Sequence, residues 1–437
     1  MRKKKHPSAQ NARHFLMKNI RPITQRENAF NKTLLRNGLR ILSERVPYAN
    51  SVAIGVWINA GSRYELPKEN GLSHLVEHAV FKGTTRRKTH QIAQYLEAVG
   101  GYLNAMTTKE NTCYYARVLP EHLERAVDLL SDLVLHPTFP EKEIEKEKQV
   151  IIEEMHAIED EPEDMVHEYF EKLIFSPHPL GQPIIGTEEN INAASAASLR
   201  RFTKKFHTTG NMVIAAAGNV HHDALTHCIE KYFSENERGA VTSSVEKLSR
   251  KKSRAEIFHK PTQQIHVCFG KPTPPIKTTS RYAMALVNII LGDGMSSRLF
   301  QAIRERYGLA YSVYSFLSFM REAGVFGVYF GADEANLDRC ISVTKEQLYA
   351  LRIGSITTRE LHRAKEQMKG GILFSLESVS DRMSHIARNE LYFEKYFSTE
   401  SILQDIDAVT LDEVHEVASS LCDVESYFMT TVLPEKT

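Results

Sequence analysis

Two histidines and a glutamate lie within five residues of an otherwise apolar stretch, "SHLVEHAVF" (73–81). On an α-helix, positions 74 and 78 are one turn apart, and position 77 lies between them on the same face. His74 and His78 can therefore offer two imidazole nitrogens to one metal ion, with Glu77 beside an open coordination position. Two imidazoles suit zinc, and a nearby carboxylate can accept a proton from water on the metal. This spacing favours metal-assisted hydrolysis.

The competing explanation for this stretch is an ordinary helix whose polar residues are satisfied in a core. A single buried histidine is usually of that kind. Here two histidines and a glutamate alternate with Leu75, Val76, Ala79 and Val80. Unpaired polar groups in such surroundings cost roughly several kcal/mol, so a metal site explains the pattern better.

A catalytic zinc ion normally keeps three protein ligands and one open position, so a third ligand is needed. A second predicted helix, 140–158, has an apolar stripe made of Ile144, Ile151, Met155 and Ile158. Glu147 and Glu154 fall on this stripe two turns apart, whereas Lys148 and Glu153 lie off it and are expected in solvent. A carboxylate on a buried face should be paired or metal-bound. The third ligand is therefore Glu147 or Glu154, and the alternative for both is an ordinary buried ion pair.

The elements that position these residues recur in two similar halves of the chain. The alternating segment "SVAIGVWIN" (51–59) has a partner in "QQIHVCFGKPTP" (263–274), and the helix pair over 123–149 has a partner over 337–367. A repeat of about 200 residues predicts two related α+β domains, each a mostly antiparallel β-sheet with helices packed on it. We expect a zinc-bearing domain over 31–233, a polar linker over 234–254 and a second domain over 255–437.

Local patterns predict the following elements. Asn37-Gly38 favours a two-residue hairpin turn, and residues 51–59 alternate like a strand with one buried face. Residues 210–220 read as a buried strand. Helical periodicity covers 72–82, 89–99, 120–135 and 140–158.

The composition narrows the class of protein. Lys and Arg (55) nearly balance Asp and Glu (54), so nothing in the charge favours a nucleic acid or membrane partner. The five cysteines are scattered and form no CxxC, which fits a reducing, cytoplasmic location. The basic segment 1–30 is expected to be a disordered tail, with an organelle import signal as the alternative.

"HLVEHAVFKGT" (74–84) followed by "EKQVIIEEM" (147–155) resembles the inverted-zincin peptidases, the family of mitochondrial processing peptidase, pitrilysin and insulin-degrading enzyme. The resemblance extends from about residue 33 to the C-terminus. It implies one zinc ion per chain, held by His74, His78 and Glu154. It also implies that Glu77 is the general base and that Glu147 supports the ligands from behind.

Two further segments resemble functional elements of that family. "GGYLNAMTTKENTCYYA" (100–116) resembles its active-site edge strand, in which the backbone of Asn104 and Ala105 would pair with an extended peptide. A plain hairpin is the alternative. "RERYGLAYSVYS" (304–315) resembles its arginine and tyrosine element, so Arg304 would contact substrate backbone and Tyr311 would stabilise the oxyanion. From the residues alone, Arg304 is a solvated helix charge.

The second half of the chain lacks the metal residues. Aligning "EIEKEKQ" with "ELHRAKE" places Ala364 opposite Glu147 and Gly371 opposite Glu154, and "YAMALVNIIL" (282–291) contains no histidine or acid. The first half of the chain thus carries the candidate metal ligands, and the second half does not.

The resemblance implies a zinc endopeptidase that acts on extended or presequence-like peptides. The alternatives are a non-catalytic partner subunit of a heterodimeric complex and a zinc hydrolase of non-peptide substrates. A chain of this length corresponds to half of the longest family members. We therefore expect a homodimer in which Arg304 and Tyr311 serve the partner's zinc, with a heterodimer or a monomer as alternatives.

Overall fold

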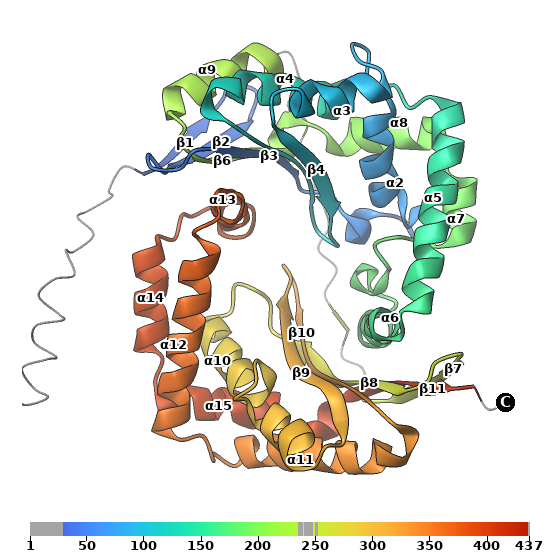
Figure 1. Cartoon of the computed structure of the whole chain (residues 1–437), viewed down its shortest axis with the longest axis vertical. Coiled ribbons are helices and arrows are strands. Elements are labelled where there is room, and N and C mark those ends of the chain that lie inside the picture. The colour runs from blue at the N-terminus through green and yellow to red at the C-terminus, as the bar shows by residue number, and fades with distance from the viewer. Residues whose placement is uncertain (1–28, 235–238, 240–247, 250–251, 436–437) are drawn as a thin grey trace, which may run out of the picture.

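The computed structural model describes residues 29–234, 239, 248–249 and 252–435. The basic segment 1–28 and most of the predicted linker lie outside the described residues. Two β-sheets, each with its own helices, form the upper and lower parts of the molecule in Figure 1. The predicted architecture of two α+β domains is therefore confirmed.

The first sheet has six strands. In spatial order they are β1 (Phe30–Leu34), β2 (Arg40–Arg45), β6 (Met212–Gly218), β3 (Val52–Ile58), β5 (Thr112–Val118) and β4 (Tyr102–Thr107). Only β2 and β6 pair in parallel. The helices of this half are α2 (Leu72–Ala79), α3 (Thr89–Glu97), α4 (Leu123–Leu135), α5 (Glu141–Asp160), α6 (Pro162–Phe175), α7 (Glu188–Ala193), α8 (Ala196–Phe206) and α9 (His222–Phe233).

The second sheet repeats this topology without the first strand. Its spatial order is β7 (Ala255–Lys260), β11 (Phe428–Pro434), β8 (Ile265–Thr273), β10 (Gly324–Ala332) and β9 (Ala310–Phe319). Again one pair, β11 with β7, is parallel. The helices are α10 (Arg281–Gly292), α11 (Leu337–Arg352), α12 (Thr358–Ser375), α13 (Val379–Phe393), α14 (Thr399–Ala408) and α15 (Leu411–Leu421), with a π-helical segment at Phe300–Arg306. The internal repeat seen in the sequence is thus a repeat of sheet topology.

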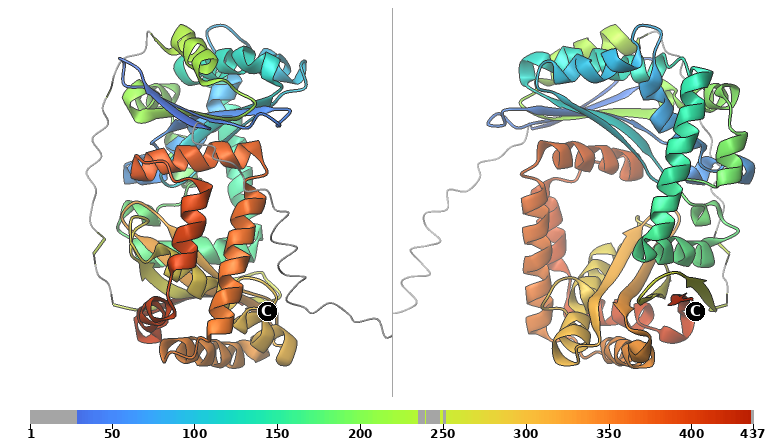
Figure 2. Two further views of the ribbon diagram at one scale, coloured as in Figure 1. Left: turned by 90° about the vertical axis from the view of Figure 1, so that its left-hand side faces the viewer. Right: turned by 45° about the vertical axis from the view of Figure 1, so that its right-hand side comes forward.

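The two halves exchange helices. Helix α13 of the second half packs on β2, β3 and β6 of the first sheet, and α6 of the first half packs on β8 and β11 of the second sheet. Figure 2 shows α13 directly against the first sheet in both views. In this contact the indole N–H of Trp57 on β3 donates to the sulfur of Met383 on α13 at 3.2 Å. Each sheet is therefore covered on one face by helices of its own half and on the other face by a helix of the other half.

This exchange corrects the prediction for residues 51–59. The alternation predicted a strand with one buried face, but every residue of β3 is buried. The side chains of Ala53 and Trp57, which point away from the first half's own helices, pack against α13 instead. The covering helix lies more than 300 residues further along the chain, so local alternation could not reveal it.

Other local predictions are confirmed with small differences. Helices α2, α3, α4 and α5 and the buried strand β6 occupy the expected stretches. The hairpin at Asn37-Gly38 exists, but its loop has three residues because the Leu35 N–H donates to the Leu39 carbonyl at 2.9 Å. Gly38 supplies the positive φ, 87°, that such a loop requires. None of the helices among the described residues is long and apolar enough to cross a membrane.

Candidate metal centre

The helix that carries both histidines is anchored at its start by a buried carboxylate. Helix α2 has Gly71 as its N-cap, with φ 98°, and glycine has no side chain to satisfy the first backbone N–H groups. Glu65 replaces the missing cap, because its carboxylate accepts the N–H of Gly71 at 2.8 Å and that of Ser73. Burial raises the pKa of Glu65 to about 7, against the opposing effect of these hydrogen bonds. Glu65 was not predicted from the sequence. The available signal was a carboxylate six residues before a glycine that precedes a predicted helix.

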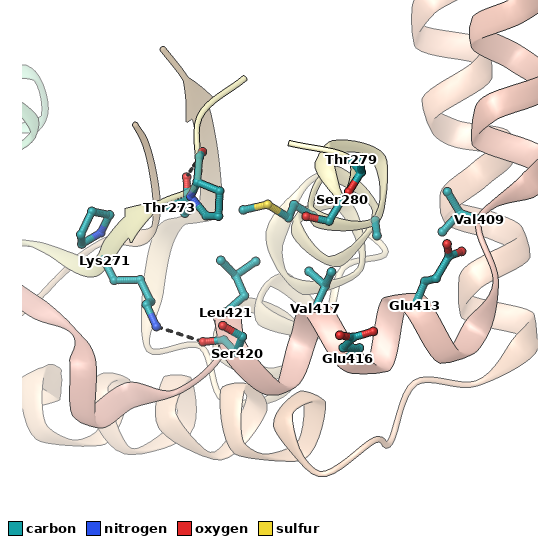
Figure 3. Close-up of a pocket in the computed structure, with 14 residues that line it drawn as sticks. Lys271, Thr273, Thr279, Ser280, Val409, Glu413, Glu416, Val417, Ser420 and Leu421 are labelled. Atoms are coloured by element: carbon teal, nitrogen blue, oxygen red, sulfur yellow. Dashed lines mark hydrogen bonds between the residues drawn. The ribbon is translucent and has the colours of Figure 1, made fainter. Parts of the chain in front are cut away.

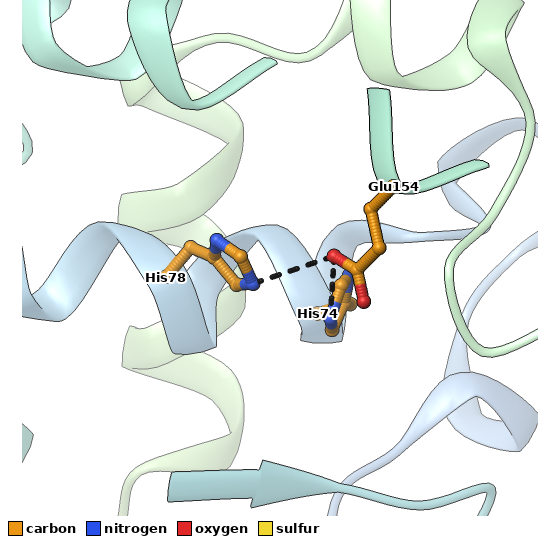
Figure 4. Close-up of side chains that lie close together, drawn as sticks. All are labelled: His74, His78 and Glu154. Carbon is orange, nitrogen blue, oxygen red and sulfur yellow. Dashed lines mark ion pairs between the residues drawn. The ribbon is translucent and has the colours of Figure 1, made fainter. Parts of the chain in front are cut away.

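Three side chains converge in front of α2. Glu154, from α5, places Oε2 3.8 Å from Nε2 of His74 and 3.9 Å from Nε2 of His78 (Figure 4). These separations are too long for hydrogen bonds. They place the three side chains a small movement away from binding one zinc ion, since ligand atoms 2.0–2.2 Å from a tetrahedral ion lie about 3.4 Å apart. Within the described part of the chain, no other three His, Cys, Asp or Glu side chains bring ligand atoms this close.

The exposed fraction of the three side chains increases from His74 through His78 to Glu154. His74 is 12% exposed, His78 23% and Glu154 44%. The prediction from the apolar stripe of α5 is that Glu147 and Glu154 both lie on a buried face. It is right for Glu147, which is buried, and wrong for Glu154, which is half-exposed because it faces the open side of the group. Lys148, expected in solvent, is buried, and its Nζ donates to the Asn192 carbonyl at 3.1 Å at the end of α7.

Glu147 lies behind His78 and not among the three converging groups. Its Oε2 is 3.2 Å from Nδ1 of His78, the ring nitrogen that faces away from Glu154. Its other oxygen forms a 2.7 Å ion pair with Lys82, which follows His78 by four residues. Because Nδ1 of His78 donates to Glu147, Nε2 is left with a free lone pair for a metal. Sequence reasoning found Glu147 but missed Lys82, whose i+4 spacing from His78 was the signal.

The imidazole of His74 is in the uncharged form that can bind a metal ion. Burial, helped by the neighbouring His78, lowers the pKa of His74 to about 4, so the imidazole is uncharged at neutral pH. Its Nδ1 is buried without a hydrogen-bond partner among the described residues. A neutral imidazole is the form that coordinates zinc.

Glu77 lies between the two histidines on α2 and reaches toward the sheet. Its Oε2 accepts a hydrogen bond from Oγ1 of Thr107, the last residue of β4, at 2.5 Å. Burial raises the pKa of Glu77, while the Thr107 hydrogen bond and the nearby His78 oppose the rise. A carboxylate with a raised pKa is suited to take up a proton and release it again.

The strand that ends at Thr107 has a free edge. β4 is the last strand of the first sheet, and among the described residues it pairs only with β5. The N–H of Ala105 points away from β5 and donates to the side-chain oxygen of Asn104 at 2.8 Å. The predicted edge strand is therefore present, and Asn104 and Ala105 lie on it with a backbone donor directed outward.

Comparisons with known proteins agree with this geometry. Residues 40–188 match the family described as insulinase (peptidase family M16), and residues 193–368 match the peptidase M16 inactive domain. The chain belongs to peptidase family M16. An uncharacterized zinc protease of Bacillus subtilis, YmxG, is 40% identical over 406 residues, which cover 91% of this chain and 97% of that protein.

Other relatives lead to the same family. An uncharacterized zinc protease of Streptomyces coelicolor is 37% identical and covers 89% of this chain and 86% of its own. The crystal structure of a protease from Helicobacter pylori has the same fold, with a TM-score of 0.87 and 22% identity over 93% of this chain and 99% of that one. The sequence resemblance to the inverted-zincin peptidases is thereby confirmed.

In this M16 chain, Arg304 and Tyr311 lie in the second half, away from the three converging side chains. Arg304 belongs to the π-helical segment, and its guanidinium lies 4.6 Å from the ring centre of Tyr311, at the start of β9. Tyr311 is 76% exposed. Among the described residues, no hydrogen bond, ion pair or ring contact joins either side chain to His74, His78 or Glu154.

The second half contains a pocket of about 460 Å³ between β8, α10 and α15 (Figure 3). Lys271 and Glu413 are among its lining residues, and Nζ of Lys271 donates to the Ser420 carbonyl at 2.9 Å. None of the site residues predicted from the sequence lines it. The pocket is therefore separate from the candidate metal centre.

Proposed function

We propose that the chain is a zinc-dependent endopeptidase that hydrolyses extended or presequence-like peptides. The observation that carries the proposal is the hydrogen bond between Thr107 and Glu77. It brings the end of a free sheet edge, which can pair with a peptide, against the carboxylate that stands beside the three converging side chains. Peptide binding and hydrolysis would thus take place at adjoining parts of one site.

The residues fit a zinc ion. Two imidazoles and one carboxylate form a typical ligand set for a catalytic zinc, and Nδ1 of His78 is already held by Glu147. His74, His78 and Glu154 would hold one ion per chain. When bound, zinc supplies Lewis acidity, which makes water a nucleophile at neutral pH.

Glu77 would carry the proton. Its carboxylate accepts a proton from the attacking water and returns it to the amine that leaves when the peptide bond breaks. Thr107 keeps the carboxylate in place by donating to Oε2, so the other oxygen remains available for water. Burial raises the pKa of Glu77, which favours the uptake of a proton by its carboxylate.

The free edge of β4 would select substrates by conformation. A peptide added to this edge is held by backbone hydrogen bonds, which do not depend on side-chain identity. The outward N–H of Ala105 would exchange its internal bond to Asn104 for a carbonyl of the peptide. Only an extended segment can pair in this way, so folded proteins would be poor substrates.

The site would be completed by a second copy of the chain. Tyr311 is exposed and makes no contact with the converging groups of its own chain, although the family resemblance gives it an oxyanion role. A twofold homodimer, the commonest symmetric oligomer, would let each chain lend Arg304 and Tyr311 to its partner. A heterodimer with a different partner chain is the alternative.

A panel of quenched peptides tests the function. The zinc-loaded chain should cleave unstructured peptides, lose activity with a chelator, and regain it with added zinc. A folded protein that contains the same cleavable sequence should stay intact. A zinc-loaded chain that cleaves no peptide would instead indicate a non-catalytic partner subunit or a zinc hydrolase of non-peptide substrates.

A further inference from the structure

The edge hairpins of the two halves are built alike. β4 and β5 are joined by the turn 108–111, and β9 and β10 by the turn 320–323. In each turn the first N–H donates to the last carbonyl oxygen at 2.8 Å. The third position carries a glutamate in both turns, Glu110 in the first half and Glu322 in the second.

These two turns meet inside the protein. Nη1 of Arg63 donates to Glu110 at 2.6 Å and also to Glu322. The backbone N–H of Arg321, in the second turn, donates to both carboxylate oxygens of Glu110 at 3.1 and 3.2 Å. The side chains of Arg63, Glu110 and Glu322 are all less than 10% exposed, so water screens this cluster little.

Helix α13 adds a third contact to the same carboxylate. The hydroxyl of Tyr392 donates to Oε2 of Glu110 at 2.8 Å and accepts from Nδ2 of Asn111 at 3.2 Å. Nη2 of Arg321 reaches the Leu391 carbonyl of the same helix at 3.1 Å. Glu110 therefore receives one bond from the first half and three from the second.

The turn that contains Glu110 directly follows β4, the strand whose last residue is hydrogen-bonded to Glu77 on α2. Thr107 donates to Glu77 and is only three residues from Glu110. β4 pairs on one side only, and such an edge strand frays unless its end is tied down. The bonds to Glu110 tie that end to the second half of the protein.

We propose that Glu110 is a positioning residue, and that the second half acts on the candidate metal centre through Arg321 and Tyr392. By fixing the turn, they keep the free edge of β4 and the hydroxyl of Thr107 in register with α2. The half without metal ligands thus sets the geometry of the half that has them. This inference rests on the proposed peptidase function.

Tyr392→Phe is the most informative change. It removes one donor to Glu110 but leaves the ion pairs with Arg63, whose loss would strand a buried charge and threaten the fold. Tyr427→Phe is the matched control. Tyr427 is an equally buried tyrosine of the second half, and its hydroxyl donates to the Leu421 carbonyl at 2.9 Å, within that half.

Both variants are compared with the full-length wild-type chain, loaded with zinc. We expect Tyr392→Phe to keep its zinc, to lower kcat for a quenched peptide about tenfold, and to speed amide hydrogen exchange over residues 102–111. Tyr427→Phe should keep wild-type kcat and wild-type exchange over that segment, even if its melting temperature falls equally.

The outcomes separate the two proposals. Wild-type kcat and exchange in Tyr392→Phe overturn the positioning role, and so does an equal kinetic loss in both variants. If the wild-type chain cleaves no peptide, the proposed peptidase fails. Exchange over residues 102–111 then decides alone whether the second half holds the turn.

Discussion

Glu110 and Glu322 stand at the same position of two equivalent hairpin turns, and both accept a hydrogen bond from Nη1 of Arg63. In the first hairpin, Thr107 at the end of β4 donates to Glu77, and in the second hairpin β9 carries Tyr311. The two elements that would contribute to one chemistry, in different copies of the chain, are thus joined within each copy by one arginine. A displacement of either hairpin would therefore strain the hydrogen bonds of Arg63 to the other.

The ligand assignment predicts which glutamate of α5 matters for metal content. Purified wild-type chain should carry about one zinc ion, and His74→Ala or Glu154→Ala should lose most of it. Glu153→Ala should keep it, because Glu153 is exposed and outside the converging group. Atomic absorption after dialysis measures the content. Equal zinc in the Glu153 and Glu154 variants would remove the basis of the assignment.

Glu77→Gln separates binding from chemistry. Glutamine keeps the shape of the side chain and an oxygen for Thr107, but it cannot accept a proton. Zinc content should therefore be unchanged, while peptide hydrolysis falls by at least about a hundredfold. Turnover close to wild type would exclude Glu77 as the base.

Lys82 should tune the affinity for zinc from behind the ligands. Its ion pair holds Glu147, which in turn holds Nδ1 of His78. Lys82→Met should weaken zinc binding about tenfold, and Lys82→Arg should restore most of it because the charge is kept. Competition with a chromophoric chelator measures the affinity. Identical affinities in the Met variant and the wild type would show that Glu147 needs no partner.

Mixing two inactive variants tests the shared site. Glu77→Gln and Tyr311→Phe homodimers should each be nearly inactive, since each change damages both sites. After subunit exchange, half of the dimers are mixed and each has one intact site, so about a quarter of wild-type activity should return. Native mass spectrometry confirms the exchange. If mixed dimers form without activity, Tyr311 does not act in the partner's site.

His207 should make stability depend on pH. It is buried, its Nδ1 donates to the Val134 carbonyl, and burial lowers the pKa to about 4. Between about pH 6.5 and 4 the unfolded chain binds a proton there that the folded chain does not, so the free energy of unfolding falls as pH falls. Without metal, wild type should lose about 2 kcal/mol more than His207→Asn between pH 7 and 4.5. Urea unfolding with chelator present measures this difference, and equal losses would contradict it.

The sequence predicted most of the metal centre because its signals are local. His74 and His78 are one helical turn apart, so their convergence needs no knowledge of the fold. The choice of the third ligand, Glu147 or Glu154, does not rest on a local signal. Both lie on one stripe of α5, and only the crossing point of α5 over α2 decides which one faces Nε2 of both histidines and which one lies behind His78. The family resemblance supplied that choice, and helical periodicity could not.

Several features that the sequence did not reveal depend on partners far along the chain. Lys148 looked solvated because α7, which covers it, is formed by residues about 40 positions later. Glu65 is an exception, because the N–H groups of Gly71 and Ser73 that it accepts at the start of α2 are only six and eight residues away. The second buried face of β3 depends on α13, far along the chain. The burial of such residues can be predicted only when the elements packed against them are known.

The exchange of α6 and α13 between the halves limits how the protein can vary over evolutionary time. A substitution on the covered face of β3 must suit a helix encoded near the other end of the gene, and the same holds for β8 and α6. The two repeats therefore cannot drift apart independently, even though only one of them carries the metal residues. Recombination that joined the first half of one relative to the second half of another would mismatch both contacts at once.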